Sequence, residues 1–193
     1  MKKIYSIHIK LISALHINAG VGLDGIRKVV KRDGRPYIPA TVVKGMIRDN
    51  FERINRTVDN EYECLGKENV KDDCNCISCT LFGKAGFQKS RVILDNLETN
   101  QATTTELRAN VAINRQLRTN NDGSLVFQEV VSPRDEKGKE IIFTGEMVVY
   151  YPPEKELAYE PHLLTAVRLI EGIGSGKSRG LGFVEVEVTE KHA

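Results

Sequence analysis

The stretch Ile7-His-Ile-Lys-Leu11 alternates apolar and polar residues with a period of two. Such alternation is typical of a strand that turns one face to the core and the other to solvent. The stretch Phe183-Val-Glu-Val-Glu-Val188, near the other end of the sequence, repeats the pattern with valine and glutamate. We therefore expect the first and last strands to share a sheet with one exposed face.

Two helices and two further strands are predicted between these end strands. The first helix begins near Thr41, a candidate cap, and its apolar residues recur at helical spacing: Val43, Ile47, Phe51 and Ile54. The second helix is predicted from an apolar set of Leu163, Leu164, Val167 and Ile170. Short strands are expected over 91–95 and 141–151. This order predicts an α+β fold with a ferredoxin-like (RRM-like) β-α-β-β-α-β core and both helices on one face of the sheet.

Residues 1–193 are expected to form a single domain, because the length is about that of one domain. Two polar segments interrupt the core pattern, over 57–86 and 98–140. The second is too long for an ordinary loop and carries turn signals, so a functional hairpin is predicted there. Residues 15–34 lack periodicity and contain four glycines, which indicates a long loop.

Composition places the chain among ordinary globular proteins, with 40% hydrophobic and 28% charged residues. No apolar run approaches the roughly 18 residues that a membrane-spanning helix needs. Polar residues interrupt the apolar stretch after the first two lysines, and no small-residue cleavage site follows it. We therefore expect a cytoplasmic protein with no membrane partner.

Positive charge is concentrated in segments although the net charge is only +2. Residues 26–48 hold seven lysines and arginines against one acidic residue, Asp33. Two smaller basic groups follow, around Arg108–Arg118 and Arg168–Arg179. Such segments can form a basic face for a polyanion, or they can be solvated side chains scattered over the surface.

All four cysteines fall within sixteen residues, in the pattern C-x9-C-x-C-x2-C: Cys64, Cys74, Cys76 and Cys79. Four thiolates on one polar segment suit structural Zn²⁺, which would cross-link a segment too polar to form its own core. A catalytic zinc is not expected, because four protein ligands leave no open position. Reduced buried thiols and disulfides are the alternatives, and disulfides would require an oxidising compartment.

The glycine-rich segment 172–182 contains Gly176-Lys-Ser178, which matches the end of a phosphate-binding P-loop. Glu171 stands where the first glycine of that motif belongs, and the segment follows a predicted helix rather than a strand. Nucleotide hydrolysis is therefore not expected. The glycines can still let backbone N–H groups approach a phosphate, and Lys177 and Arg179 add charge; the alternative is a flexible connector.

Several segments, in order along nearly the whole chain, resemble the RAMP superfamily of CRISPR-Cas proteins. They are His16-Ile-Asn-Ala-Gly20, Arg35-Pro-Tyr-Ile-Pro-Ala-Thr-Val-Val-Lys-Gly45, Cys76-Ile-Ser-Cys79-Thr-Leu-Phe-Gly83, Val111-Ala-Ile-Asn-Arg115 with Leu125-Val-Phe127-Gln-Glu129, and the glycine-rich segment. The similarity is greatest to the repeated backbone subunit of type III effector complexes.

This resemblance implies copies of the chain assembled as a filament on a CRISPR guide RNA, beside other effector subunits. It implies that residues 98–140 form a thumb hairpin that displaces a nucleotide of the guide–target duplex. The RNA-binding residues implied by matching positions are Lys44, Arg48, Arg115, Arg118, Gly174, Ser175, Gly176, Lys177, Ser178 and Arg179. Arg115 and Arg118 are expected at the base of the thumb. Such contacts read phosphate and shape, while base pairing supplies sequence specificity.

The resemblance also implies cleavage of target RNA by an aspartate in the loop after the first strand. Asp24 is the candidate, and Mg²⁺ or a similar divalent ion would assist attack of a ribose 2′-hydroxyl on the neighbouring phosphate. The proline that often follows this aspartate in the family is absent, since Gly25-Ile26-Arg27 follows here. A turn aspartate between glycines is the alternative.

Three functions are therefore carried forward. The chain is a metal-dependent endoribonuclease within the guide-bound scaffold, a scaffold without catalysis, or an enzyme that processes CRISPR transcripts. The third typically uses a histidine acid or base. The histidines, His8, His16, His162 and His192, form no evident cluster in the sequence.

Overall fold

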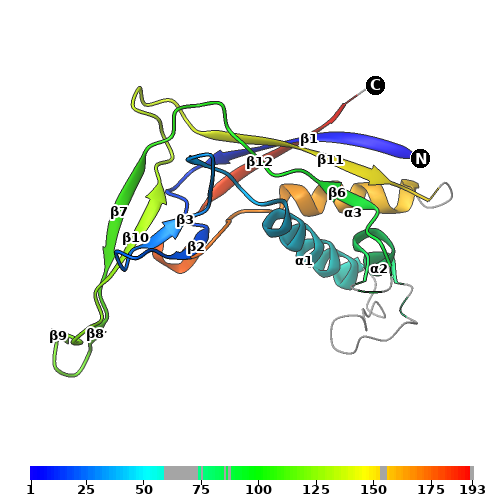
Figure 1. The fold of residues 1–193 in the computed structure, drawn as a ribbon. Helices are drawn as coiled ribbons and strands as arrows, with labels where there is room; N and C mark the ends of the chain where they lie inside the picture. Colours follow the sequence, from blue (N-terminus) through cyan, green and yellow to red (C-terminus); the bar gives the residue numbers. More distant parts are fainter. Residues whose placement is uncertain (59–73, 75, 85, 87, 153–155, 192–193) are drawn as a thin grey trace.

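The structure is a computed structural model that describes residues 1–58, 74, 76–84, 86, 88–152 and 156–191. Cys64 and His192, and with them two of the sequence predictions, lie outside the described residues. The described chain contains two four-stranded sheets and two short two-stranded ribbons. Figure 1 shows one four-stranded sheet, the first described below, above the helices and the second four-stranded sheet to one side of them.

The first sheet has the strand order β12-β1-β11-β6, and every neighbouring pair is antiparallel. Its strands are β1 (Lys2–Leu11), β6 (Val92–Leu94), β11 (Ile142–Tyr150) and β12 (Val184–Lys191). Ile7 lies opposite both Gly145 of β11 and Val188 of β12, so β1 occupies the interior of the sheet. Ile7 and Ile9 are fully buried, which confirms the period of two read from the sequence.

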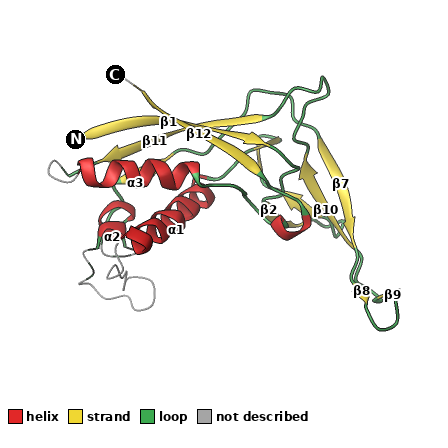
Figure 2. Ribbon diagram, turned by 180° about the vertical axis from the view of Figure 1, so that it is seen from behind, coloured by secondary structure: helices red, strands yellow, loops and turns green. Residues whose placement is uncertain are grey.

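Three helices are described, and they lie on one side of the first sheet (Figures 1 and 2): α1 (Ala40–Val58), α2 (Ile77–Phe82) and α3 (Glu156–Arg168). The inward residues of α1, Val43, Ile47 and Phe51, are fully buried, as their spacing predicts. Asn96, rather than Thr41, accepts the hydrogen bond from the first helical amide, at 2.9 Å from Ala40 N to Asn96 Oδ1. The first helix is therefore capped from the segment after β6.

The second sheet has the order β2-β3-β10-β7. Its strands are β2 (Asn18–Val21), β3 (Arg27–Val29), β7 (Thr105–Asn110) and β10 (Val126–Val131). β7 and β10 pair antiparallel as a hairpin that ends in the ribbon of β8 (Ile113–Asn114) and β9 (Thr119–Asn120). In both views the β8–β9 end lies farthest from the helices. Another ribbon pairs β4 (Lys31–Arg32) with β5 (Arg35–Pro36).

The loop predicted over residues 15–34 is wrong, because this segment forms β2, β3 and β4. β3 pairs in parallel with β10, about one hundred residues later in the chain, through Arg27 and Gln128. Leu15 forms an isolated bridge with Val131. These short strands have no hydrophobic period of their own, since distant partners hold them in place.

The mixed α+β class predicted from the sequence is confirmed by this arrangement. The main hydrophobic core of the protein lies between the first sheet and the helices. Within the described residues, no helix is both long enough and apolar enough to cross a membrane.

Candidate nucleic-acid interface

The glycine-rich loop, residues 172–182, packs its backbone against the segment that follows β1. At Gly174, with a φ of 81°, a Cβ atom would overlap the carbonyl oxygen of His16. At Gly182, with a φ of 72°, a Cβ atom would overlap the carbonyl oxygen of Ile173. Both glycines are therefore required by contacts within the protein, whereas the sequence reading assigned the glycines to close approach of a phosphate.

Several backbone amides of this loop already have partners inside the chain. Ser175 N donates to His16 O at 3.0 Å, and Gly182 N donates to Ala14 O at 2.8 Å. The amides of Arg179, Gly180 and Leu181 donate to carbonyl groups within the loop. These five amides are not available to a phosphate. The loop therefore presents the exposed side chains of the short 3₁₀ turn η1 (Lys177–Arg179).

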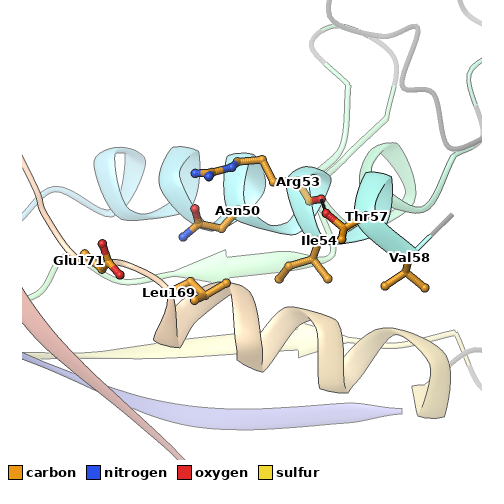
Figure 3. Close-up of a pocket in the computed structure, with 7 residues that line it drawn as sticks. All are labelled: Asn50, Arg53, Ile54, Thr57, Val58, Leu169 and Glu171. Atoms are coloured by element: carbon orange, nitrogen blue, oxygen red, sulfur yellow. Dashed lines mark hydrogen bonds between the residues drawn. The ribbon is translucent and has the colours of Figure 1, made fainter. Parts of the chain in front are cut away.

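Lys177 lines a cavity of about 510 Å³ beside α1. The cavity shares Asn50, Arg53, Leu169 and Glu171 with an adjoining groove of about 370 Å³ that runs along α1 to Val58 (Figure 3). Two basic residues, Arg53 and Lys177, line the pair of cavities with two acidic residues, Asp49 and Glu171. Such balanced charge does not favour a polyanion over other ligands.

Arg179 lines a different cavity, of about 220 Å³, between the loop and the stem of the β7–β10 hairpin. This Arg27–Arg179 cavity is lined by Arg27, Asn110, Val111, Ala112, Ser124, Val126, Gln128 and Arg179. The lining contains two guanidinium groups and no acidic side chain. Among the described residues, neither the Arg27 nor the Arg179 guanidinium group has a hydrogen-bond or ion-pair partner. The two charges therefore remain available to an anion from outside the chain.

Lys44 and Arg48 lie one turn apart on α1, but neither lines the cavities beside Lys177. Arg48 is already paired, with Nε 2.9 Å from Glu52 Oε1 and a guanidinium nitrogen 3.4 Å from Gly83 O. Burial, and next the charge of Arg48, lowers the pKa of Lys44. A phosphate beside Lys44 would offset that repulsion. The structure thus places these two residues on a part of α1 separate from the glycine-rich loop.

Arg115 and Arg118 lie in the turn that joins β8 to β9, at the far end of the hairpin. The expectation that they lie at its base is wrong. The sequence Asn121-Asp-Gly123, which is typical of a hairpin turn, lies in the returning arm, where Asn121 N donates to Ala112 O across the hairpin at 2.9 Å. The chain reverses earlier, at 115–118, and Arg118 takes a positive φ of 54° there.

Asp24 lies in the tight turn between β2 and β3, with its side chain about half exposed. One carboxylate oxygen accepts from Lys28 Nζ at 2.6 Å, and the other accepts from Ile26 N at 3.1 Å. The hydrogen bond from Lys28, followed by that from Ile26, lowers the pKa of Asp24. The carboxylate is therefore ionised at neutral pH and is engaged in an ion pair.

Cys74, Cys76 and Cys79 bring their sulfur atoms within 4.8 Å of one another. Cys76 precedes α2, and its sulfur accepts a hydrogen bond from Cys79 N at 3.4 Å. Cys74 and Cys79 are buried. Three converging thiol groups can hold a soft metal ion such as zinc, and the burial of two of them excludes water from most of the site.

Comparison with known proteins places this geometry in a family. A model of the RAMP superfamily matches residues 8–185, which is nearly the whole chain. The chain belongs to the RAMP superfamily. Membership implies a CRISPR-associated RNA-binding function, and some RAMP proteins are RNA endoribonucleases. No curated protein matches the chain.

Two polar residues that line the Arg27–Arg179 cavity, Asn110 and Gln128, were missed by the sequence reading of this RAMP protein. Arg27 was noticed only as one member of a basic segment. The parallel pairing of β3 with β10 brings Arg27 beside Gln128. Residue patterns carry no signal for a single pairing over such a separation, so these residues could not be identified together from the sequence.

The three described histidines of this RAMP protein lie apart. His16 is 1% exposed, and its Nδ1 lies 2.6 Å from Glu129 O. His162 bonds Asn55, whereas His8 bonds Ser6 and Thr144 on the sheet. None of the three shares a polar partner with another, so the described histidines offer no paired acid and base.

Proposed function

We propose that the chain is the CRISPR RNA-binding backbone subunit of a type III effector complex. The observation that carries the proposal is the pair of unpartnered guanidinium groups, Arg27 and Arg179, between the glycine-rich loop and the hairpin of a RAMP protein. Phosphate oxygens are strong acceptors for guanidinium groups, and contacts of this kind bind RNA without reading its sequence. Sequence specificity then comes from base pairing of the guide.

The core is proposed to be ferredoxin-like, in a single domain. Support comes from the element order β1, α1, β6, β11, α3, β12 and from the sheet order β12-β1-β11-β6. The proposed thumb, residues 98–140, contains the β7–β10 hairpin. Its end carries Arg115 and Arg118, which have no partner in the described part of the chain. In this proposal those two residues contact RNA beyond the body of the subunit that carries them.

The scaffold role is tested by the number of protein copies on guide RNAs of increasing length. A repeating subunit adds one copy for each fixed increment of RNA, and sedimentation or native mass spectrometry counts the copies. We expect a stepwise rise in the mass of the complex. A single copy on every length of RNA would reject the filament.

Target cleavage is proposed to depend on Asp24, whose carboxylate would hold a divalent ion such as Mg²⁺; the ion would assist attack of a ribose 2′-hydroxyl on the neighbouring phosphate. Exposure of Asp24 at a turn of the hairpin-bearing sheet supports this role, because an RNA phosphate can approach it. Lys28 is paired with one carboxylate oxygen of Asp24, so its ammonium group would compete with a metal ion for that oxygen. In the assembled complex, Asp24→Ala should abolish target cleavage and leave guide binding intact. Unchanged cleavage would leave the scaffold role alone.

Processing of CRISPR transcripts is the competing activity. Incubation of the isolated chain with a repeat RNA tests it directly. We expect no specific cleavage, because the described histidines lie apart. A specific cut in the repeat would favour the processing enzyme over the scaffold.

The cysteine segment, residues 57–86, is proposed to bind structural Zn²⁺ through Cys74, Cys76 and Cys79, with Cys64 as the fourth ligand. The convergence of three sulfur atoms supports this assignment. The site would hold the start of α2 through Cys76, and Arg48 of α1 contacts the carbonyl group at the other end of that helix. Zinc would therefore stabilise the segment and the end of the core next to it.

A further inference from the structure

The Arg27–Arg179 cavity is lined by a polar side chain, Gln128, that has no hydrogen-bond partner in the described part of the chain. Gln128 is 3% exposed and lines the cavity, and its carboxamide has no hydrogen-bond partner among the described residues. The carboxamide is not sealed from solvent, because no atom of Gln128 is among the fully buried side-chain atoms that lack a partner within the described residues. It can therefore hydrogen-bond a molecule that enters the cavity. The cavity thus offers a donor and an acceptor for a ligand.

The strand pairing fixes where this carboxamide lies relative to the charges. Gln128 of β10 is directly paired with Arg27 of β3 on one side and with Arg108 of β7 on the other. Arg179 lines the same cavity from the glycine-rich loop, an element outside this sheet. Two guanidinium groups from separate elements therefore share a single opening with the carboxamides of Gln128 and Asn110, and no carboxylate opposes them there.

The chemistry of this set matches one ribose-phosphate unit. Guanidinium groups bind a phosphate, and a carboxamide both donates and accepts a hydrogen bond, as a ribose 2′-hydroxyl does. The volume, about 220 Å³, lies below the roughly 300 Å³ at which small-molecule pockets begin. The cavity is therefore better suited to a short segment of a longer nucleic-acid strand than to a complete free ligand.

We propose that Gln128 reads the ribose 2′-hydroxyl of the strand whose phosphate is held by Arg27 and Arg179. The protein thereby distinguishes RNA from DNA. This inference rests on the proposed RNA-binding function and assigns to the site a sugar-reading residue. Arg27 and Arg179 supply affinity for either kind of strand, and Gln128 supplies the preference for ribose.

The test compares two fluorescent oligonucleotides, a 12-mer of uridine and a 12-mer of deoxyuridine, which differ only in the 2′-hydroxyl groups. Fluorescence anisotropy with the full chain gives the two dissociation constants. We expect the unaltered protein to bind the uridine strand about fivefold more tightly, which corresponds to one neutral hydrogen bond. Gln128→Met keeps the side-chain length without the amide and should bring the ratio close to one, chiefly by weakening the uridine complex.

Arg27→Ala separates phosphate binding from sugar reading. It should weaken both complexes about tenfold and keep their ratio, because both strands carry the same phosphates. Arg168→Ala removes another exposed arginine that does not line the cavity, and it should change neither constant by more than about twofold. Gln128→Leu provides a second apolar variant, and thermal melting verifies that each variant is folded.

The outcomes separate failure of the inference from failure of the proposed function. A uridine-to-deoxyuridine ratio that stays the same in both folded Gln128 variants would overturn the inference while RNA binding stands. Equal affinity of the unaltered protein for the uridine and deoxyuridine strands would also overturn the inference. If the unaltered protein bound neither strand, the proposed function would fail and the inference with it.

Discussion

The two four-stranded sheets of this RAMP protein differ in whether their basic side chains have acidic partners. Of the four lysines in the strands of the first sheet, all but Lys2 are paired with glutamates among the described residues: Lys10 contacts Glu185, Lys191 contacts Glu146, and Lys3 lies 2.8 Å from Glu160. These pairs cancel their fields at close range. The open face of that sheet therefore offers little attraction to a polyanion.

On the second sheet and the loop beside it, some cations are paired and others are not. Lys28 and Lys31 bind Asp24 and Glu129. In contrast, the following have no partner in the part of the chain that the structure describes: Arg27, Arg115, Arg118, Lys177 and Arg179. The comparison teaches that the proposed RNA interface is marked by unpaired cations, which a count of charge along the sequence does not reveal. Changes on the first sheet and beside the helices should alter stability, and changes on the second should alter RNA binding.

The largest effect on stability is expected at the cysteine cluster. Replacement of both Cys76 and Cys79 by serine, or removal of the metal by a chelator, should lower the free energy of unfolding by several kcal/mol, since structural zinc contributes binding energy of that size to folding. Denaturant unfolding measures the change. A chelator should not destabilise the double serine variant further, and a protein that contains no zinc would contradict the assignment.

A smaller loss of stability is expected from Glu160→Gln. Glu160 accepts hydrogen bonds from Lys3 Nζ at 2.8 Å and from Tyr5 OH at 2.5 Å, next to the buried core. Loss of the charged acceptor should cost about 1–2 kcal/mol by thermal or denaturant unfolding. RNA affinity should stay the same. A loss of RNA affinity without a loss of stability would break the division between the two sheets.

The pH dependence of the same variant gives an independent measurement. Burial raises the pKa of Glu160, but the hydrogen bonds from Lys3 and Tyr5 outweigh it and lower the pKa below its ordinary value. The ionised form is therefore favoured by folding. Its contribution is complete above the ordinary glutamate pKa and is lost as the pH falls through the lowered value. The stability gap between the unaltered protein and Glu160→Gln should close over that acidic range, and a gap independent of pH would contradict this.

Removal of the two arginines at the end of the hairpin should act on binding instead. Arg115→Ala with Arg118→Ala should weaken the complex with single-stranded RNA by roughly fivefold and should flatten its dependence on salt concentration, because fewer counterions are released. Stability should stay constant, since neither side chain has a partner within the described residues. An unchanged salt slope would show that the end of the hairpin does not touch RNA.

The smallest effect on binding is expected from Asp24→Asn. Loss of this carboxylate frees Lys28 and removes a negative charge from the sheet that bears the hairpin. RNA affinity should change by no more than about twofold, in the direction of tighter binding. Weaker binding by anisotropy would assign Asp24 to the affinity of the complex instead of to cleavage.

The body of the fold was accessible from the sequence because its elements carry their own periodicity. Ile7, Ile9 and Leu11 alternate, and Val43, Ile47 and Phe51 follow one helix face, so burial could be predicted from spacing alone. The short strands β2 and β3 have no such pattern and depend on pairing with β10. Sequence periodicity alone therefore predicts a loop where these strands form.

The sequence predicts only some residues of the candidate site, because spacing along the chain does not show which charges are already paired. Lys177 and Arg179 lie in the glycine-rich segment, which is recognisable from its composition. The cysteine spacing predicts a metal site, and the sulfur atoms of Cys74, Cys76 and Cys79 do converge. Arg48 is also a candidate RNA-binding residue by its position in the sequence, but in the structure it is paired with the buried Glu52. The sequence does not show that this glutamate is buried. Residue type indicates a charge; only packing decides whether the charge is already neutralised.

The most direct test of the central claim compares two double variants that remove the same number of positive charges. Lys177→Ala with Arg179→Ala removes cations without partners, whereas Lys10→Ala with Lys191→Ala removes cations paired with Glu185 and Glu146. Anisotropy titrations with one RNA over a range of salt concentrations should show about a 10- to 100-fold loss of affinity and a salt slope reduced by about two for the first variant. The second should change affinity by less than about twofold. Equal losses in the two variants would contradict the account, because RNA binding would then follow total charge and not the unpaired cations.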